Sequence, residues 1–214
     1  MHPLDCPAWN YESHPDRDRI LPDRASAIVE GLRRRTIDSG LLAADSRRAH
    51  RILFEQLTPR DCSYYAGHYR GENYRCLLYL SVRIPSDPSV GSPPHRVLSD
   101  MAIVAFEVKA GLAALDEAQI LPNAQLAPED KLLYAVVFAC HVFEVFLRVH
   151  PYANGNGHAA RLIVWAILCR YGYWPRKWPI EPRLTDPLYT SLLVEYRNGN
   201  RMPLEAFIVQ CIIG

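Results

Sequence analysis

The pattern of apolar and polar residues along the chain predicts a protein built almost entirely of helices. Apolar side chains recur every three or four positions, the spacing that gathers them on one face of a helix, in the stretches 24–37, 43–57, 93–115, 128–149, 157–171, 187–196 and 204–213. Residues 75–84 differ, because their apolar and β-branched side chains are typical of a strand. We therefore expect a mainly α fold with one small β element.

The composition is that of a single folded domain. Of the 214 residues, 49% are apolar, which is enough to fill one core. Residues 1–23 are polar and contain several prolines, so we expect an irregular N-terminal arm followed by one domain over residues 24–214. The net charge of +1 gives no broad field that would attract nucleic acid or an anionic membrane. No charge-free apolar run approaches the roughly 18 residues that span a bilayer. We expect neither nucleic acid nor a membrane as a partner.

The six cysteines, at positions 6, 62, 76, 140, 169 and 211, are scattered along the chain and form no C-x-x-C pair. A zinc site is therefore not expected. Residues 1–23 contain no apolar core of a signal peptide. Our expectation is a cytoplasmic protein whose thiols stay reduced.

The chemistry is concentrated between the predicted helices 128–149 and 157–171. Proline, glycine and asparagine residues make this stretch a tight turn. The first amides of the second helix lack helical partners, and residues 155–157 let the backbone lie close to an anion. His150 precedes that turn, and Arg161 follows it on the first turn of the helix. A titratable base, free amides and a cation are the parts that phosphoryl or nucleotidyl transfer needs. A plain structural turn would use the same turn residues.

This stretch resembles the Fic motif, written H-P-F-x-(D/E)-G-N-G-R-x-x-R, at His150, Pro151, Gly155, Asn156, Gly157 and Arg161, with Tyr152 in place of phenylalanine. The resemblance implies a Fic-type helical fold and a protein adenylyltransferase, a nucleotidyltransferase that moves AMP from ATP to a Ser, Thr or Tyr hydroxyl of a target protein. It also implies Mg²⁺ or Mn²⁺ as the metal that accompanies ATP. His150 would be the catalytic base. The phosphates would be bound by Gly155, Asn156, Gly157, His158 and Arg161.

Two positions depart from the family pattern. Asn154 stands where the family has the acidic residue that binds Mg²⁺, and a neutral amide oxygen holds that ion less well than a carboxylate does. His158 stands where the family has an arginine, and an imidazole lacks the charged fork that binds phosphate. We expect both changes to weaken the enzyme. They leave open a nucleotide- or phosphate-binding module with little transfer, or transfer of another phosphate-containing group such as UMP or phosphocholine.

A second resemblance lies in the predicted helix 24–37. Ser26, Glu30 and Gly31 match the inhibitory pattern (S/T)-x-x-x-E-(G/N) that accompanies Fic domains, in the N-terminal position of one class. The resemblance implies that Glu30 pairs with Arg161 and keeps the enzyme autoinhibited. The alternative is an ordinary surface glutamate on an amphipathic helix.

A third resemblance concerns the strand-like segment. Residues 67–70, Gly-His-Tyr-Arg, are similar to the element that precedes the β-hairpin flap of Fic domains. Residues 73–84 would then form the flap, with Tyr79 and Leu80 docking an extended target segment by strand addition. The alternative is a small hairpin that only covers the core. Family members are often dimers, so the resemblance also leaves a homodimer open.

Overall fold

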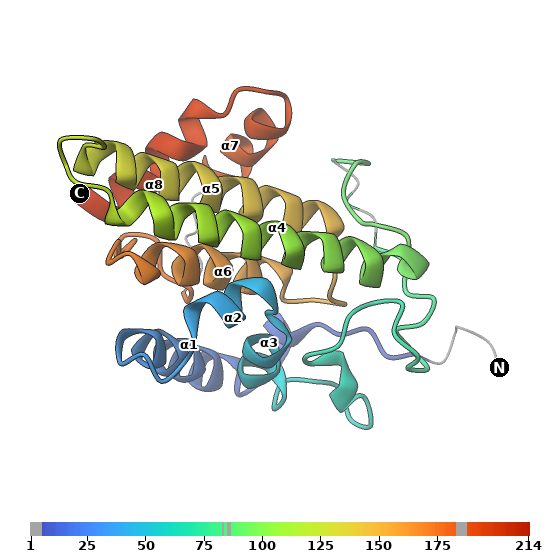
Figure 1. Cartoon of the computed structure of the whole chain (residues 1–214). Coiled ribbons are helices and arrows are strands. Elements are labelled where there is room, and N and C mark those ends of the chain that lie inside the picture. The colour runs from blue at the N-terminus through green and yellow to red at the C-terminus, as the bar shows by residue number, and fades with distance from the viewer. Residues whose placement is uncertain (1–5, 83, 85–86, 183–187) are drawn as a thin grey trace.

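The computed structural model describes residues 6–82, 84, 87–182 and 188–214 (Figure 1). This part of the chain contains the helices α1 (Arg17–Arg33), α2 (Ser39–Ala44), α3 (Arg47–Phe54), α4 (Pro94–Ile120), α5 (Pro128–Val149), α6 (Asn156–Arg170), α7 (Leu188–Arg197) and α8 (Met202–Ile213). Short 3₁₀ helices cover Tyr11–Ser13 (η2) and Ser63–Tyr65 (η3). The prediction of a mainly α fold is confirmed.

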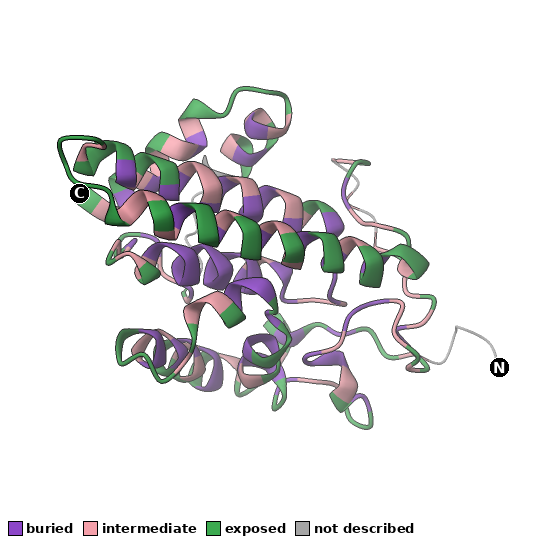
Figure 2. Ribbon diagram, viewed as in Figure 1, coloured by how far each residue is buried: buried purple, intermediate pink, exposed green. Residues whose placement is uncertain are grey.

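Helix α6 is the centre of the molecule. Every residue from Leu162 to Leu168 is buried, and a helix that is apolar all round has to be enclosed by other elements. Helices α5 and α2 pack against α6, and α4 packs in turn against α5 and α2. Figure 2 shows this central helix almost entirely in the colour of buried residues. The turn that joins α5 to α6 is therefore held at one end of two core helices.

Helix α5 begins where proline and acidic residues predict it to begin. Pro128 needs no amide partner in a first turn, and Glu129 and Asp130 favour the positive end of the helix. By length and composition α5 could cross a membrane, but 56% of its most apolar window is buried inside the fold. The core helix of a globular protein meets the same criteria, and α5 packs against α4, α6 and α8.

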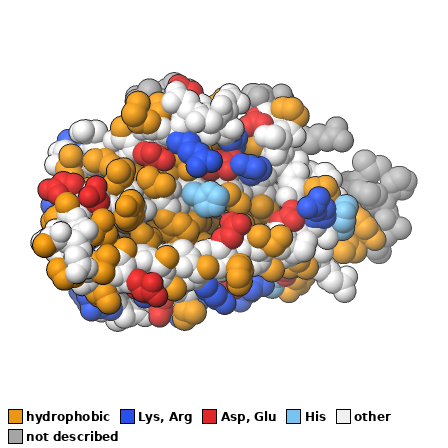
Figure 3. Space-filling view, turned by 45° about the horizontal axis from the view of Figure 1, so that its top comes forward, with side chains coloured by type: hydrophobic (Ala, Val, Ile, Leu, Met, Phe, Trp, Pro, Cys, Tyr) orange, Lys and Arg blue, Asp and Glu red, His pale blue; other side chains and the backbone are white. Residues whose placement is uncertain are grey.

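Some apolar side chains remain at the surface. Figure 3 shows hydrophobic side chains gathered over a large part of one face, interrupted by charged residues. Ile103 and Phe106 of α4 and Tyr134 of α5 are among the exposed hydrophobic residues.

The first helix starts earlier than predicted. We expected it over residues 24–37, but α1 starts at Arg17 and includes Pro22. Ile20 and Leu21 are buried, so packing of this extra turn outweighs the helix-breaking tendency of the proline. The irregular arm, residues 6–16 in the described part of the chain, is shorter than expected.

The predicted flap strand is not formed by the described residues. Within 75–82 the backbone turns repeatedly, with Leu77 and Leu78 donating to the carbonyl of Tyr74 at 3.0 and 2.9 Å. Only one isolated antiparallel bridge, Ile84 with Asp87, appears nearby. Burial of Leu77 draws the segment into the core, so its amides are used in turns instead of a ladder.

A disulfide joins Cys6 to Cys76, whose Cα atoms lie 5.6 Å apart. The expectation that the thiols stay reduced is therefore wrong for these two cysteines, which no local motif pairs because they are separated by 70 residues. Among the described residues Cys62, Cys140, Cys169 and Cys211 are free thiols. The bond fixes the start of the arm to the segment where the flap was expected.

Candidate functional site

The turn from α5 to α6 requires unusual backbone at both ends. His150 ends α5 in the left-handed region at φ 53°, and Gly155 precedes α6 at φ 76°. A Cβ added to Gly155 would lie 2.5 Å from Phe54 and 2.9 Å from Nε2 of His50. Only glycine fits this close approach without strain. Asn156 closes the turn, because its side chain accepts from the Tyr152 amide at 2.9 Å and donates to the Tyr152 carbonyl at 3.0 Å.

The start of α6 offers amides and a cation. The backbone amides of Asn156 and Gly157 donate to none of the described residues, as expected for the first turn of a helix. The guanidinium of Arg161 folds back beside them, with Nη1 3.4 Å from where a Cβ on Gly157 would lie. Arg161 is buried and donates to the Ile180 carbonyl at 2.9 Å. Two amides and a buried guanidinium make this position suited to an anion.

His150 is suited to accept a proton. Burial lowers its pKa to about 4, and the nearby cations of Arg70 and Arg197 act in the same direction. The Leu147 backbone opposes this shift, yet Nδ1 of His150 is buried without a hydrogen-bond partner among the described residues. The imidazole is therefore neutral at pH 7, with one nitrogen still available for a proton.

His158 is engaged in a buried network. Its Nε2 lies 2.7 Å from Oε2 of Glu181, and its Nδ1 lies 3.4 Å from the hydroxyl of Tyr11. Burial lowers the pKa of His158, so the neutral ring donates from Nε2 to the carboxylate. Burial alone would raise the pKa of Glu181, but the hydrogen bond from His158 and the cations of Arg17 and Arg161 lower it. Glu181 is thus an ionised carboxylate held close to the predicted phosphate-binding residues.

Asn154 is bonded to the N-terminal arm. Its amide nitrogen donates to the Trp9 carbonyl at 2.9 Å and to Glu12 at 3.2 Å. Its side-chain oxygen accepts from the amide of Gly155 at 2.7 Å. The described residues contain no group of three or more His, Cys, Asp and Glu side chains placed to hold a metal ion. The residues at position 154 and around it therefore do not fit a metal held by the protein.

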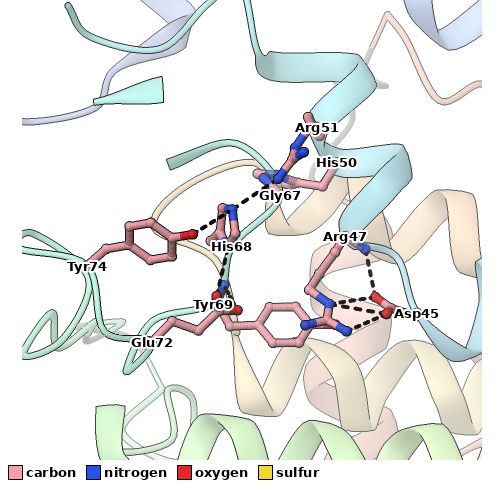
Figure 4. A network of polar contacts seen from close by, with 9 residues as sticks. All are labelled: Asp45, Arg47, His50, Arg51, Gly67, His68, Tyr69, Glu72 and Tyr74. Atoms are coloured by element: carbon pink, nitrogen blue, oxygen red, sulfur yellow. Dashed lines mark hydrogen bonds and ion pairs between the residues drawn. The ribbon is translucent and has the colours of Figure 1, made fainter. Parts of the chain in front are cut away.

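His50 is a site residue that the sequence analysis missed. Its Nδ1 accepts from the Gly67 amide and its Nε2 donates to the Asn154 carbonyl, both at 3.0 Å. The ring also stacks on Tyr152, with centroids 3.6 Å apart. Figure 4 shows His50 beside Gly67 and the neighbouring polar contacts. Burial lowers the pKa of His50 to about 3, so it is a neutral bridge between α3, residue 67 and the turn.

The N-terminal arm lies against the turn. Trp9 donates to the Leu57 carbonyl at 2.8 Å, and its ring meets Phe54 edge-on at 5.7 Å. Tyr11 contacts Phe54 at 4.8 Å and His158 at 5.9 Å between ring centroids. Asn154 and His158, the positions that lack the charged residue of the family motif, thus both contact this arm.

The residues of the inhibitory pattern lie on α1, away from the pairing expected for them. Glu30 contacts Arg34 at 2.6 Å and Arg33 at 3.5 Å. The expected Glu30–Arg161 ion pair is therefore not formed in this structure, since arginines three and four positions along the helix take up the carboxylate. Ser26 and Glu30 line a cleft of about 380 Å³ together with Ile180 and Glu181. Gly31 is buried at the end of the helix, where its carbonyl accepts from the amides of residues 36 and 37.

The two docking residues predicted from the flap differ in exposure. Tyr79 is 77% exposed, whereas Leu80 is half-buried and its carbonyl accepts from Arg70 at 3.0 Å. Neither lies on a strand.

Curated proteins similar to this chain are named adenylyltransferases. The chain is 29% identical over 86 residues to the protein adenylyltransferase Fic of Nematostella vectensis, a match covering 40% of this chain and 19% of that protein. It is 30% identical over 79 residues to the proteins of the same name from Drosophila persimilis and Drosophila pseudoobscura pseudoobscura, covering 37% of this chain and 15% of each. The matches therefore span less than a fifth of these relatives. No protein-family model matches the chain. Over part of its length the chain is thus similar to proteins of the Fic family.

Proposed function

We propose that this chain is a protein adenylyltransferase that transfers AMP from ATP to a hydroxyl side chain of a target protein. The observation that carries the proposal is the neutral, half-buried imidazole of His150, whose Nδ1 has no hydrogen-bond partner among the described residues, at the turn that opens into the first amides of α6. A pure binding site has no need of a base.

In this reaction His150 takes the proton of a Ser, Thr or Tyr hydroxyl. The hydroxyl oxygen attacks the α-phosphorus of ATP, the bond to the bridging oxygen breaks, and pyrophosphate leaves. The amides of Asn156 and Gly157 and the guanidinium of Arg161 hold the phosphate oxygens. We expect Mg²⁺ or Mn²⁺ to arrive with ATP, because the described residues supply no metal site of their own.

Two finer points belong to the same proposal. Tyr79 and Leu80 would contact the target, through an exposed ring and a neighbouring backbone segment rather than through a paired strand. Glu30 would inhibit the enzyme only after a shift of α1, since it now pairs with Arg33 and Arg34. A cytoplasmic location and a homodimer remain predictions.

A second candidate function is a nucleotide- or phosphate-binding module with little transfer. The observation in its favour is that Asn154 and His158 are already engaged, with the arm and with Glu181. Lost phosphate and metal contacts at these positions would each weaken transfer. Transfer of UMP or phosphocholine remains a variant of the enzymatic proposal.

Labelled ATP distinguishes these functions. With Mg²⁺ or Mn²⁺, we expect the wild-type protein to transfer label to itself or to proteins in a mixture. The His150→Ala variant should transfer no label. The Glu30→Gly variant should transfer more label than wild type. Intact ATP binding without label in all three proteins would support the binding module. Label from UTP or CDP-choline, but not from ATP, would support the variant reaction. Equal labelling by wild type and Glu30→Gly would contradict the inhibitory role of Glu30 but not the transfer reaction.

A further inference from the structure

Arg70 is a buried guanidinium whose partners are backbone carbonyls. The residue is 0% exposed. Its Nε donates to the carbonyl of His150 at 2.9 Å, and Nη2 donates to that of Val149 at 3.1 Å. Nη1 donates to Leu80 at 3.0 Å, and both terminal nitrogens donate to Ser92 at 3.2 Å. No ion pair of Arg70 with a carboxylate is formed among the described residues.

The first pair of acceptors lies at the end of α5. The last carbonyls of a helix have no amide to accept from and carry partial negative charge, so a buried cation is stabilised there. His150 also holds a left-handed backbone at φ 53°, which is unfavourable for a residue with a Cβ. The side chain of Arg70 binds the carbonyls of Val149 and His150, and its own amide donates to Pro151 at 2.8 Å. Arg70 thus fixes the peptides on both sides of the base.

The second pair of acceptors is Leu80 and Ser92, which flank residues 81–91. Leu80 belongs to the segment expected to meet the target, and Ser92 is anchored by a 2.6 Å hydrogen bond to Asp100 of α4. The amides of Gly91 and Ser92 donate to the last carbonyls of α5, at 2.8 and 3.1 Å. The planar guanidinium of Arg70 therefore hydrogen-bonds to the backbone of His150 and also to the backbone of Leu80 and Ser92.

We propose that Arg70 is a positioning residue for the transfer reaction: it sets the orientation of His150 and couples that orientation to the backbone of Leu80, where a target would dock, and of Ser92. This role rests on the proposed function. A lysine at this position could keep the charge but could not donate in a fixed fork to four carbonyls.

The chain offers a matched control in Lys131. Its ammonium is also buried and also donates to carbonyls, those of Leu121 at 2.5 Å and Gln119 at 3.2 Å, but it lies at the beginning of α5, whereas Arg70 binds the end. We expect Arg70→Lys to lower kcat at least tenfold while the KM for ATP changes less than twofold. We expect Lys131→Met to lower the thermal midpoint and leave kcat within twofold. Equal kcat in wild type and Arg70→Lys would overturn the proposal, as would an equal loss of kcat in both variants.

Two further measurements keep the test decisive. Ser92→Ala removes the hydrogen bond to Asp100 without deleting a buried cation, so it should fold even if Arg70→Lys does not. We expect it to lower kcat at least threefold at unchanged KM for ATP, and an unchanged kcat would contradict the coupling. The histidine NMR spectrum, with the His150 signal assigned by His150→Ala, needs no activity. A shifted His150 signal in Ser92→Ala or Arg70→Lys, and an unshifted one in Lys131→Met, is expected. If wild type transfers nothing, the proposed function fails, while an unmoved His150 signal alone would overturn the role of Arg70.

Discussion

The side-chain amide of Asn154 donates to the backbone carbonyl of Trp9 at 2.9 Å. A position that in the family pattern is acidic is therefore used here to hold the N-terminal arm against the turn. Because the same nitrogen faces the carboxylate of Glu12 at 3.2 Å, the amide is a better partner for the arm than an acid would be.

Restoring the acid should consequently loosen the arm. Asn154→Asp removes the donor to Trp9 and sets two carboxylates side by side, while the bond from the Gly155 amide can remain. We expect the free energy of unfolding to fall by about 1–2 kcal/mol, and hydrogen exchange in residues 7–13 to become faster. Adding Glu12→Gln should recover part of the loss, because it removes the like-charge contact. Unchanged exchange in Asn154→Asp would show that these contacts do not hold the arm.

Gly155 should be less replaceable than Gly199, another glycine with positive φ. Gly155→Ala combines a left-handed backbone with contacts of 2.5 Å to Phe54 and 2.9 Å to His50. We expect a loss of about 2–4 kcal/mol in unfolding free energy, measured by urea denaturation. Gly199→Ala is the matched control, because Gly199 has φ 95° with no atom within 4 Å of the added Cβ. That variant should lose only about 1–2 kcal/mol, the strain of the backbone alone. Equal losses would mean that the turn can move away from α3.

The buried histidines predict that acid destabilises the fold. His50 has a folded-state pKa of about 3, against about 6.5 in an unfolded chain. Between these values the unfolded state binds a proton that the folded state does not, so stability falls as the pH drops from about 6.5 towards 3, by about 1.4 kcal/mol per pH unit for this residue. His50→Gln should flatten the dependence of unfolding free energy on pH in this window. His150 will keep a slope in that variant, because its pKa is also lowered. A steeper slope in His50→Gln would contradict this explanation.

The disulfide predicts a redox-dependent stability. Cys6 and Cys76 close a long loop, and such a crosslink stabilises a fold by about 2–4 kcal/mol, mainly by restricting the unfolded chain. A dithiol reductant should therefore lower the thermal midpoint of wild-type protein. The double variant Cys6→Ser, Cys76→Ser should start at the lower midpoint and not respond to the reductant. A response of equal size in both proteins would assign the effect to other thiols.

The sequence predicted the structure best where the boundaries of a helix depend on its own residues and not on packing against other elements. Pro128 and the acids after it mark the start of α5, and the left-handed turn at His150 ends it. Packing decided the places where prediction failed. Pro22 lies inside α1 because Ile20 and Leu21 are buried, and residues 75–82 turn instead of forming a strand.

The residues of the candidate site also fall into those that the sequence predicted and those that only packing brings together. The motif identified the turn and Arg161, but not the groups that distant segments bring to it. His50 reaches the Asn154 carbonyl across 104 positions of sequence, and Tyr11 reaches His158 across 147. Nothing local distinguishes such residues from ordinary core side chains. Glu30 failed to meet Arg161 for a local reason, since its own helix offers two closer arginines.

The bond between Cys6 and Cys76 also fixes the position of the first described residue. Cys6 is the first described residue, and the bond places it beside Cys76, only a few residues from Tyr79. Figure 1 shows the C-terminus at one end of the helical core, away from the turns that follow α3. An affinity tag joined after α8 would therefore lie away from Tyr79, the proposed docking residue.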